Sequence, residues 1–196
     1  MSKMNKEEAL KFSEYGHKLM TRIQNSSIPV ISAINGYALG GGCELVISSH
    51  IRYASENAII GQPEVGLGLI AGFGGTQRLQ KIIGKSKAIE LLITGESIEA
   101  NKCLNIGLID KIFKKDKLML GVNNLCLKIS NNSLAAIKAT MKTVNYSSYN
   151  SFDASLKNES IEFSNLFESY DMNEGTKAFL EKRKPNFKKN IILLYK

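Results

Sequence analysis

The chain has 196 residues, 43% of them hydrophobic, and carries a net charge of +8 from 26 Lys and Arg against 18 Asp and Glu. This length and apolar share suffice for one domain with a buried core. No apolar run approaches the ~20 residues that cross a bilayer, and the charged start MSKMNKEEALKF contains no apolar secretory segment. Three scattered cysteines are too few for a disulfide framework or a zinc site. We therefore expect reduced thiols, no metal, no membrane and a cytoplasmic location.

The positive charge is compatible with an anionic partner, but a lysine-rich composition also simply solvates a surface. The sequence contains no zinc-finger spacing, no RNP-like strand and no basic patch interleaved with aromatic residues. We predict that nucleic acid is not a partner.

The first 60 residues alternate helical and strand patterns. Apolar residues recur at three- and four-residue spacing over 6–24, which predicts an amphipathic helix. The β-branched segment 30–34 predicts a buried strand, and a glycine run leads into a short buried helix over 43–48. Two further strands are expected at 51–54 and 58–60. This part of the chain is therefore predicted to be α/β.

Beyond residue 60 helices dominate. Thr76 is predicted to cap a helix that ends at Gly84, and a second helix covers 86–93. Ser97 is predicted to cap another helix that closes at Gly107. The remaining expected elements are a short exposed strand over 108–112 and helices that begin near residues 117, 134 and 152, the last running to 170. No linker indicates two independent domains.

Two carboxylates lie beside glycine-rich loops in apolar surroundings. Glu44 follows Gly40-Gly41-Gly42, and Glu64 precedes a second glycine-rich loop. Glycines at a helix start can offer a backbone N–H to a developing oxyanion, but they also serve a tight turn. Glu44 by itself could cap its own helix. Together the two glutamates fit acid/base chemistry, because burial can keep one carboxyl protonated while the other ionises.

The other reactive side chains are expected to have no catalytic role. His17 and His50 are single histidines, which are more often structural or exposed than catalytic. Cys43 has no nearby histidine and is taken as a packing residue. The segment 72–75 matches neither a dinucleotide fingerprint nor a phosphate loop, so we expect no cofactor.

Residues 28–84, from IPVISAINGYALGGGCEL to GFGGTQRLQKIIG, resemble the enoyl-CoA hydratase/isomerase (crotonase) family. The likeness continues through 92–96, 105–109, 132–133 and 174–183. It implies an α/β fold of the ClpP/crotonase type, a spiral of ββα units followed by a C-terminal helical trimerisation region. We therefore expect an α/β core over 1–115 and a helical region over 116–196.

The resemblance also implies an activity, the addition of water to a trans-2-enoyl-CoA to give a 3-hydroxyacyl-CoA. The Gly41 N–H matches an oxyanion-hole donor, and Glu44 and Glu64 match the two catalytic glutamates. Isomerases of the family usually lack the first glutamate, so the pair favours a hydratase. Phe179 and Lys182 match positions that contact the CoA adenine region, often of a neighbouring subunit. The implied assembly is a homotrimer or homohexamer, with coenzyme A as part of the substrate and no separate cofactor.

One departure concerns the start of the chain. Family members carry earlier ββα units and a loop that supplies the second oxyanion donor. We therefore expect a spiral that is incomplete at its N-terminus, with impaired activity. An isomerase, another acyl-CoA enzyme of the superfamily and an inactive truncated paralogue are the alternatives.

Overall fold

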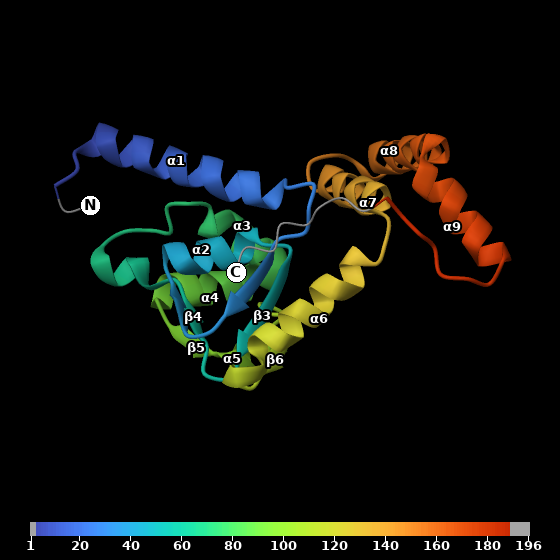
Figure 1. The fold of residues 1–196 in the computed structure, drawn as a ribbon. Helices are drawn as coiled ribbons and strands as arrows, with labels where there is room; N and C mark the ends of the chain where they lie inside the picture. The colour runs from blue at the N-terminus through green and yellow to red at the C-terminus, as the bar shows by residue number, and fades with distance from the viewer. Residues whose placement is uncertain (1–2, 189–196) are drawn as a thin grey trace. The chain divides into compact units, whose positions relative to one another are not determined.

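The computed structural model describes residues 3–188, which form two compact units (Figure 1). The first unit contains the chain up to Gln24 together with Pro29–Val122. The second contains Asn25–Ile28 and the chain from Asn123 onward. Over the described residues, no helix is long and apolar enough to cross a membrane.

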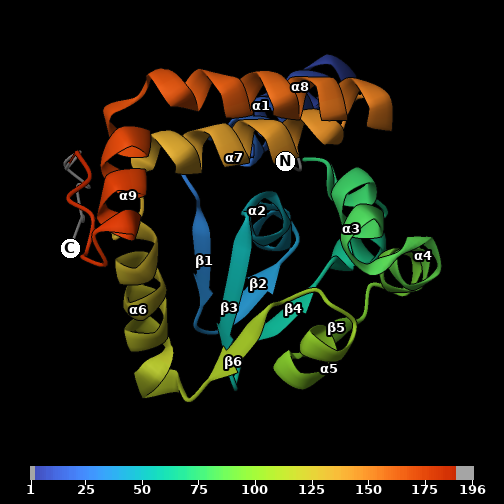
Figure 2. The same cartoon turned by 90° about the vertical axis from the view of Figure 1, so that its right-hand side faces the viewer.

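The first unit contains two small sheets (Figure 2). The first has the order β1-β3-β6 and is parallel throughout; the second has the order β2-β4-β5, with β5 antiparallel to β4. Their bounds are β1 Ile31–Ile34, β2 Tyr37–Leu39, β3 Ile51–Ser55, β4 Ile59–Gly61, β5 Ser97–Glu99 and β6 Lys111–Phe113. Twice the chain passes from a strand of the first sheet to one of the second and then into a helix. This is the ββα alternation that the family resemblance implies.

The helices of this unit are α1 Lys6–Gln24, α2 Gly41–Ser48, η1 Pro63–Leu67, α3 Gly75–Ile83, α4 Lys85–Thr94 and α5 Ala100–Asn105. In this unit α2 packs against β2, whereas α1 packs on α2 and leaves Leu10, Tyr15 and Leu19 of the predicted apolar stripe exposed. The core contains Ile60 and Leu79, which are at most 1% exposed, together with other aliphatic residues of α2, α4 and β5. Burying such side chains is the main favourable term in folding. Gly84 and Gly95 follow α3 and α4, as predicted.

Three local predictions were wrong. Thr76 does not cap α3: the helix begins at Gly75, after Gly74, and has no side-chain cap. Ser97 begins strand β5, because Ile98 pairs with Ile60 of β4 in the buried core, and α5 starts only at Ala100. The expected exposed strand over 108–112 is shifted to β6, and Leu108 and Ile109 before it are each 1% exposed.

The second unit is helical. After η2 (Lys115–Lys117), helix α6 (Leu118–Ser130) begins in the first unit and ends in the second. The following elements are α7 Leu134–Ser147, α8 Phe152–Asn165, η3 Leu166–Glu168 and α9 Tyr170–Leu180. The side chains of Ser133, Ser151 and Ser169 cap α7, α8 and α9 by accepting a backbone N–H. The single helix predicted over 152–170 is therefore interrupted, and Ser169 starts a new one.

Candidate active site

A sharp turn at Gly40 joins β2 to α2. Gly40 has φ 55° and ψ −122°, the mirror image of the extended region, which glycine adopts without steric cost. Its N–H donates to the Gly61 carbonyl at 3.0 Å, so the turn is tied to the end of β4. The next N–H, on Gly41, is partly exposed and has no acceptor among the described residues. At the first position of a helix, such an N–H can bind an anionic oxygen.

Glu44 is buried beneath this turn, at 2% exposure. Its Oε1 accepts hydrogen bonds from the backbone N–H of Phe73 at 2.7 Å and of Gly75 at 2.8 Å. The start of α2 has no side-chain cap, so Glu44 does not serve its own helix. Two N–H donors from a neighbouring loop thus hold this carboxylate in place.

Glu64 lies in η1, directly after β4, and is half-buried. Gln62, itself 1% exposed, donates its amide N–H groups to Oε1 and Oε2 of Glu64 at 3.0 and 3.1 Å. Burial raises the pKa of Glu64, and the negative charge of Glu44 raises it further. Glu64 is therefore the carboxyl that holds its proton more tightly than usual.

The structure brings the two glutamates and the glycine turn together. A Cβ on Gly40 would lie 3.0 Å from Glu64 Oε1, and a Cβ on Gly75 would lie 3.1 Å from Glu44 Oε1. A Cβ on Gly75 would also lie 2.8 Å from the side-chain amide of Gln62. The other polar atom of this amide contacts Glu64. Glycine is thus required where the backbone approaches each carboxylate. The arrangement contains one carboxylate held by two backbone N–H groups, one carboxyl whose pKa is raised and one available N–H donor.

Phe179 and Lys182 belong to the second unit. Phe179, on α9, is 82% exposed, and Lys182, just after α9, has φ 54°. Their expected contact with coenzyme A stays a prediction.

The remaining reactive side chains have structural surroundings. Burial raises the pKa of Cys43 to about 12, with the charges of Glu44 and Glu64 adding to it, so the thiol stays protonated. His50 Nδ1 accepts the Val30 N–H at 2.9 Å, and its Nε2 lies 2.9 Å from the Gln24 carbonyl oxygen. Among residues 3–188 no group of His, Cys, Asp and Glu is arranged to hold a metal ion.

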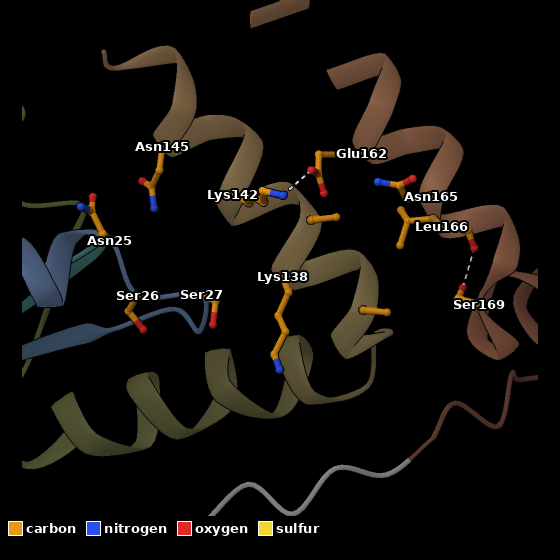
Figure 3. Close-up of a pocket in the computed structure, with 12 residues that line it drawn as sticks. Asn25, Ser26, Ser27, Lys138, Lys142, Asn145, Glu162, Asn165, Leu166 and Ser169 are labelled. Atoms are coloured by element: carbon orange, nitrogen blue, oxygen red, sulfur yellow. Dashed lines mark hydrogen bonds and ion pairs between the residues drawn. The ribbon is translucent and has the colours of Figure 1, made fainter. Parts of the chain in front are cut away.

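The second unit has a separate cavity of about 500 Å³ (Figure 3). Lys138 and the ion pair of Lys142 with Glu162 line it, together with amide and hydroxyl side chains. None of the predicted site residues lines this cavity.

The sequence did not identify three of the groups that hold the glutamates. Two are the backbone N–H groups of Phe73 and Gly75, which have no residue signature of their own. The third is Gln62, whose only signal is its position two residues before Glu64, at the end of a buried strand. Its contact with Glu64 can be recognised only once β4 is placed beside α2 in the folded chain.

The ββα units of the fold place two carboxyl groups beside a glycine turn. This combination defines a candidate acid/base enzyme. The model of the enoyl-CoA hydratase/isomerase family matches residues 1–190, and the chain belongs to this family.

Known proteins agree with this assignment. The chain is 42% identical to the short-chain-enoyl-CoA hydratase of Clostridium acetobutylicum, over 94% of this chain and 70% of that protein. It is 39% identical to the crotonyl-CoA hydratase of Syntrophomonas wolfei, over 95% of this chain and 72% of that protein. The crystal structure of an enoyl-CoA hydratase from Bacillus anthracis superposes with a TM-score of 0.91 at 33% identity, covering 95% of this chain and 72% of that one. The predicted family and its α/β fold are confirmed.

Proposed function

We propose that the chain adds water to a trans-2-enoyl-CoA to give a 3-hydroxyacyl-CoA. The observation that carries the proposal is a pair of carboxyl groups beside one glycine turn, in different surroundings. Glu44 accepts two backbone N–H groups, whereas burial raises the pKa of Glu64. Relatives that are about 40% identical are named as hydratases of enoyl-CoA thioesters.

In the proposed reaction one water molecule lies between the two glutamates. The ionised Glu44 takes a proton from this water as its oxygen bonds to C3 of the substrate, and the protonated Glu64 gives its proton to C2. Glu44 ends protonated and Glu64 ionised, and exchange with solvent restores the starting states. Atoms and charge balance, so the step requires no cofactor. General acid or base action of this kind contributes about 10²–10⁴-fold in rate.

The Gly41 N–H is proposed to bind the thioester oxygen. Adding water at C3 places enolate-like negative charge on this oxygen, and a donor already in place stabilises that charge. Removing one such donor costs about 10²–10³-fold in rate. The position of Gly41 at the first turn of α2, next to the turn that contacts Glu64, supports this assignment.

The test replaces each glutamate by its amide. Glu44→Gln and Glu64→Gln should each lower turnover of crotonyl-CoA by about 10²–10⁴-fold, because an amide has the shape but not the proton affinity of a carboxylate. Glu56→Gln, on an exposed turn between β3 and β4, is the matched control and should leave turnover unchanged. Near wild-type hydration by either site variant would refute the assignment.

The proposed partner is the CoA portion of the substrate, in a homotrimer or homohexamer located in the cytoplasm. Phe179 and Lys182 are proposed to contact the adenine end of CoA from a neighbouring subunit. Phe179 lies on the last turn of α9 and is highly exposed, and Lys182 follows the end of the helix. Lys182→Ala should raise KM for crotonyl-CoA but not for crotonyl-pantetheine, which lacks the adenine. Equal changes with both substrates would contradict this contact.

A further inference from the structure

The loop over residues 72–75, which donates two N–H groups to Glu44, is itself held by α1. Ser13 Oγ donates to the Gly72 carbonyl. The ring of Phe12 packs against the ring of Phe73 in a T-shaped arrangement, with centroids 5.0 Å apart. These contacts join residues that are some sixty positions apart in the sequence, so they do not arise from local structure. They connect the middle of α1 to the loop.

The backbone of α1 makes room for the Phe73 ring at Gly16. Gly16 is one of two buried residues in this helix. A Cβ at Gly16 would overlap the Phe73 ring, much closer than non-bonded carbon atoms approach one another. The other side of the ring lies about 3.5 Å from where a Cβ on Gly41 would be. Phe73 is therefore enclosed between α1 and the proposed oxyanion-hole donor.

A third connection passes through Arg78 of α3. Its Nη1 donates to the Phe73 carbonyl at 2.9 Å. Its Nε donates to Gln24 Oε1 at 2.7 Å and its Nη2 to Thr21 Oγ1 at 3.1 Å, both on α1. The guanidinium fork thus links the carbonyl of Phe73 to the C-terminal end of the helix.

We propose that α1 positions Glu44, and that Gly16 and Phe73 are positioning residues for this proposed base. The helix holds the ring and the carbonyl of Phe73, and the N–H of the same residue holds Glu44 at 2.7 Å. In this inference a Cβ at Gly16 displaces the Phe73 ring together with its backbone, and the displaced N–H shifts the Glu44 carboxylate. The inference rests on the proposed hydratase function. It adds a determinant of rate beyond the two glutamates and the Gly41 N–H.

The variant Gly16→Ala tests this contact. The added methyl group must displace the Phe73 ring, and a misplacement of about 1 Å in a catalytic group can cost about 10²-fold in rate. We expect kcat for crotonyl-CoA to fall by about that factor while KM changes less than about twofold.

Two further variants separate this effect from loss of folding. Gly121→Ala in α6 places a Cβ against the Phe113 ring in the same way, but far along the chain from Glu44, and should leave kcat unchanged. In a Phe73→Ala background the ring is absent, so Gly16→Ala should cause no further loss. Equal losses from Gly16→Ala with and without the ring would overturn the proposal.

A readout without substrate distinguishes this inference from the proposed function. Hydrogen–deuterium exchange of the Phe73 and Gly75 amides should be slow in the wild type, because Glu44 accepts both N–H groups. Gly16→Ala should accelerate exchange at both amides, and Gly121→Ala at neither. If the wild type does not hydrate crotonyl-CoA but exchange follows this pattern, the proposed function fails and the positioning of Glu44 stands. Unchanged exchange in Gly16→Ala refutes the positioning itself.

Discussion

Gly40 links the backbone conformation of the turn between β2 and α2 to the geometry of the candidate site. Its φ of 55° and ψ of −122° are open to glycine and strained for every residue with a Cβ. A Cβ there would also lie 3.0 Å from Glu64 Oε1. The substitution Gly40→Ala therefore tests both the turn that presents the Gly41 N–H and the proximity of the turn to Glu64.

The expected magnitude follows from these two observations. Holding a residue in a sparsely populated region costs about 1–3 kcal/mol. For a chain of this size, each kcal/mol lowers the melting temperature by about 2–4 °C, so Gly40→Ala should lower it by about 2–12 °C. The Glu64 carboxylate must also move by a few tenths of an ångström, so we expect turnover to fall together with stability.

The assay is thermal unfolding combined with hydration of crotonyl-CoA. Gly36→Ala is the matched control, because a Cβ at Gly36 would meet nothing within 4 Å and its φ is not positive. The control should unfold within about 1–2 °C of the wild type, which corresponds to a surface change of about 0.5 kcal/mol. If Gly40→Ala is as stable and as active as the control, the strained turn is not a determinant of the site.

Three further predictions concern titratable groups. The folded chain binds the Glu64 proton more tightly than the unfolded chain, so stability to urea should decrease as pH rises through the raised pKa. Glu64→Gln should remove this part of the dependence of stability on pH. An unchanged dependence would count against the argument from burial. With a pKa of about 12, Cys43 should resist iodoacetamide at pH 8 in the folded protein while the partly exposed Cys126 reacts, and equal rates would contradict its burial. Hydrogen bonds from Arg183 lower the pKa of Glu174 to about 2, so their contribution to stability is present above the ordinary carboxyl range and is lost as pH falls toward 2. Arg183→Gln should return the Glu174 titration, followed by NMR, toward its ordinary value, and an unshifted midpoint would refute the pairing.

Much of the fold was predictable because several elements are specified locally. Helix α1 shows helical periodicity over its whole length, and glycines follow α3 and α4 where the pattern indicates. The three-residue strands β2 and β5 were missed. Their stability comes from pairing with β4, as in the pair of Ile98 with Ile60, and so short a segment carries no periodic signal. Because the three residues of β5 show no strand pattern, Ser97 was predicted to cap a helix instead.

The candidate site was predictable only where side chains carry it. Glu44 and Glu64 were identified because carboxylates in apolar surroundings are unusual. The Phe73 amide binds Glu44, and the Gln62 side chain binds Glu64. Both partners come from segments that only the tertiary structure brings next to the glutamates. Gly16 lies inside the helix predicted over 6–24, and its contact with Phe73 depends on how that helix packs.

Hydration of crotonyl-CoA by Glu44→Gln, by Glu64→Gln and by the variant that carries both changes tests most directly whether the two glutamates act on one water. Residues that work as a unit have strongly non-additive effects. We predict that the double variant is about as slow as the slower single variant. Two separate losses that multiply in the double variant would show that the glutamates act independently.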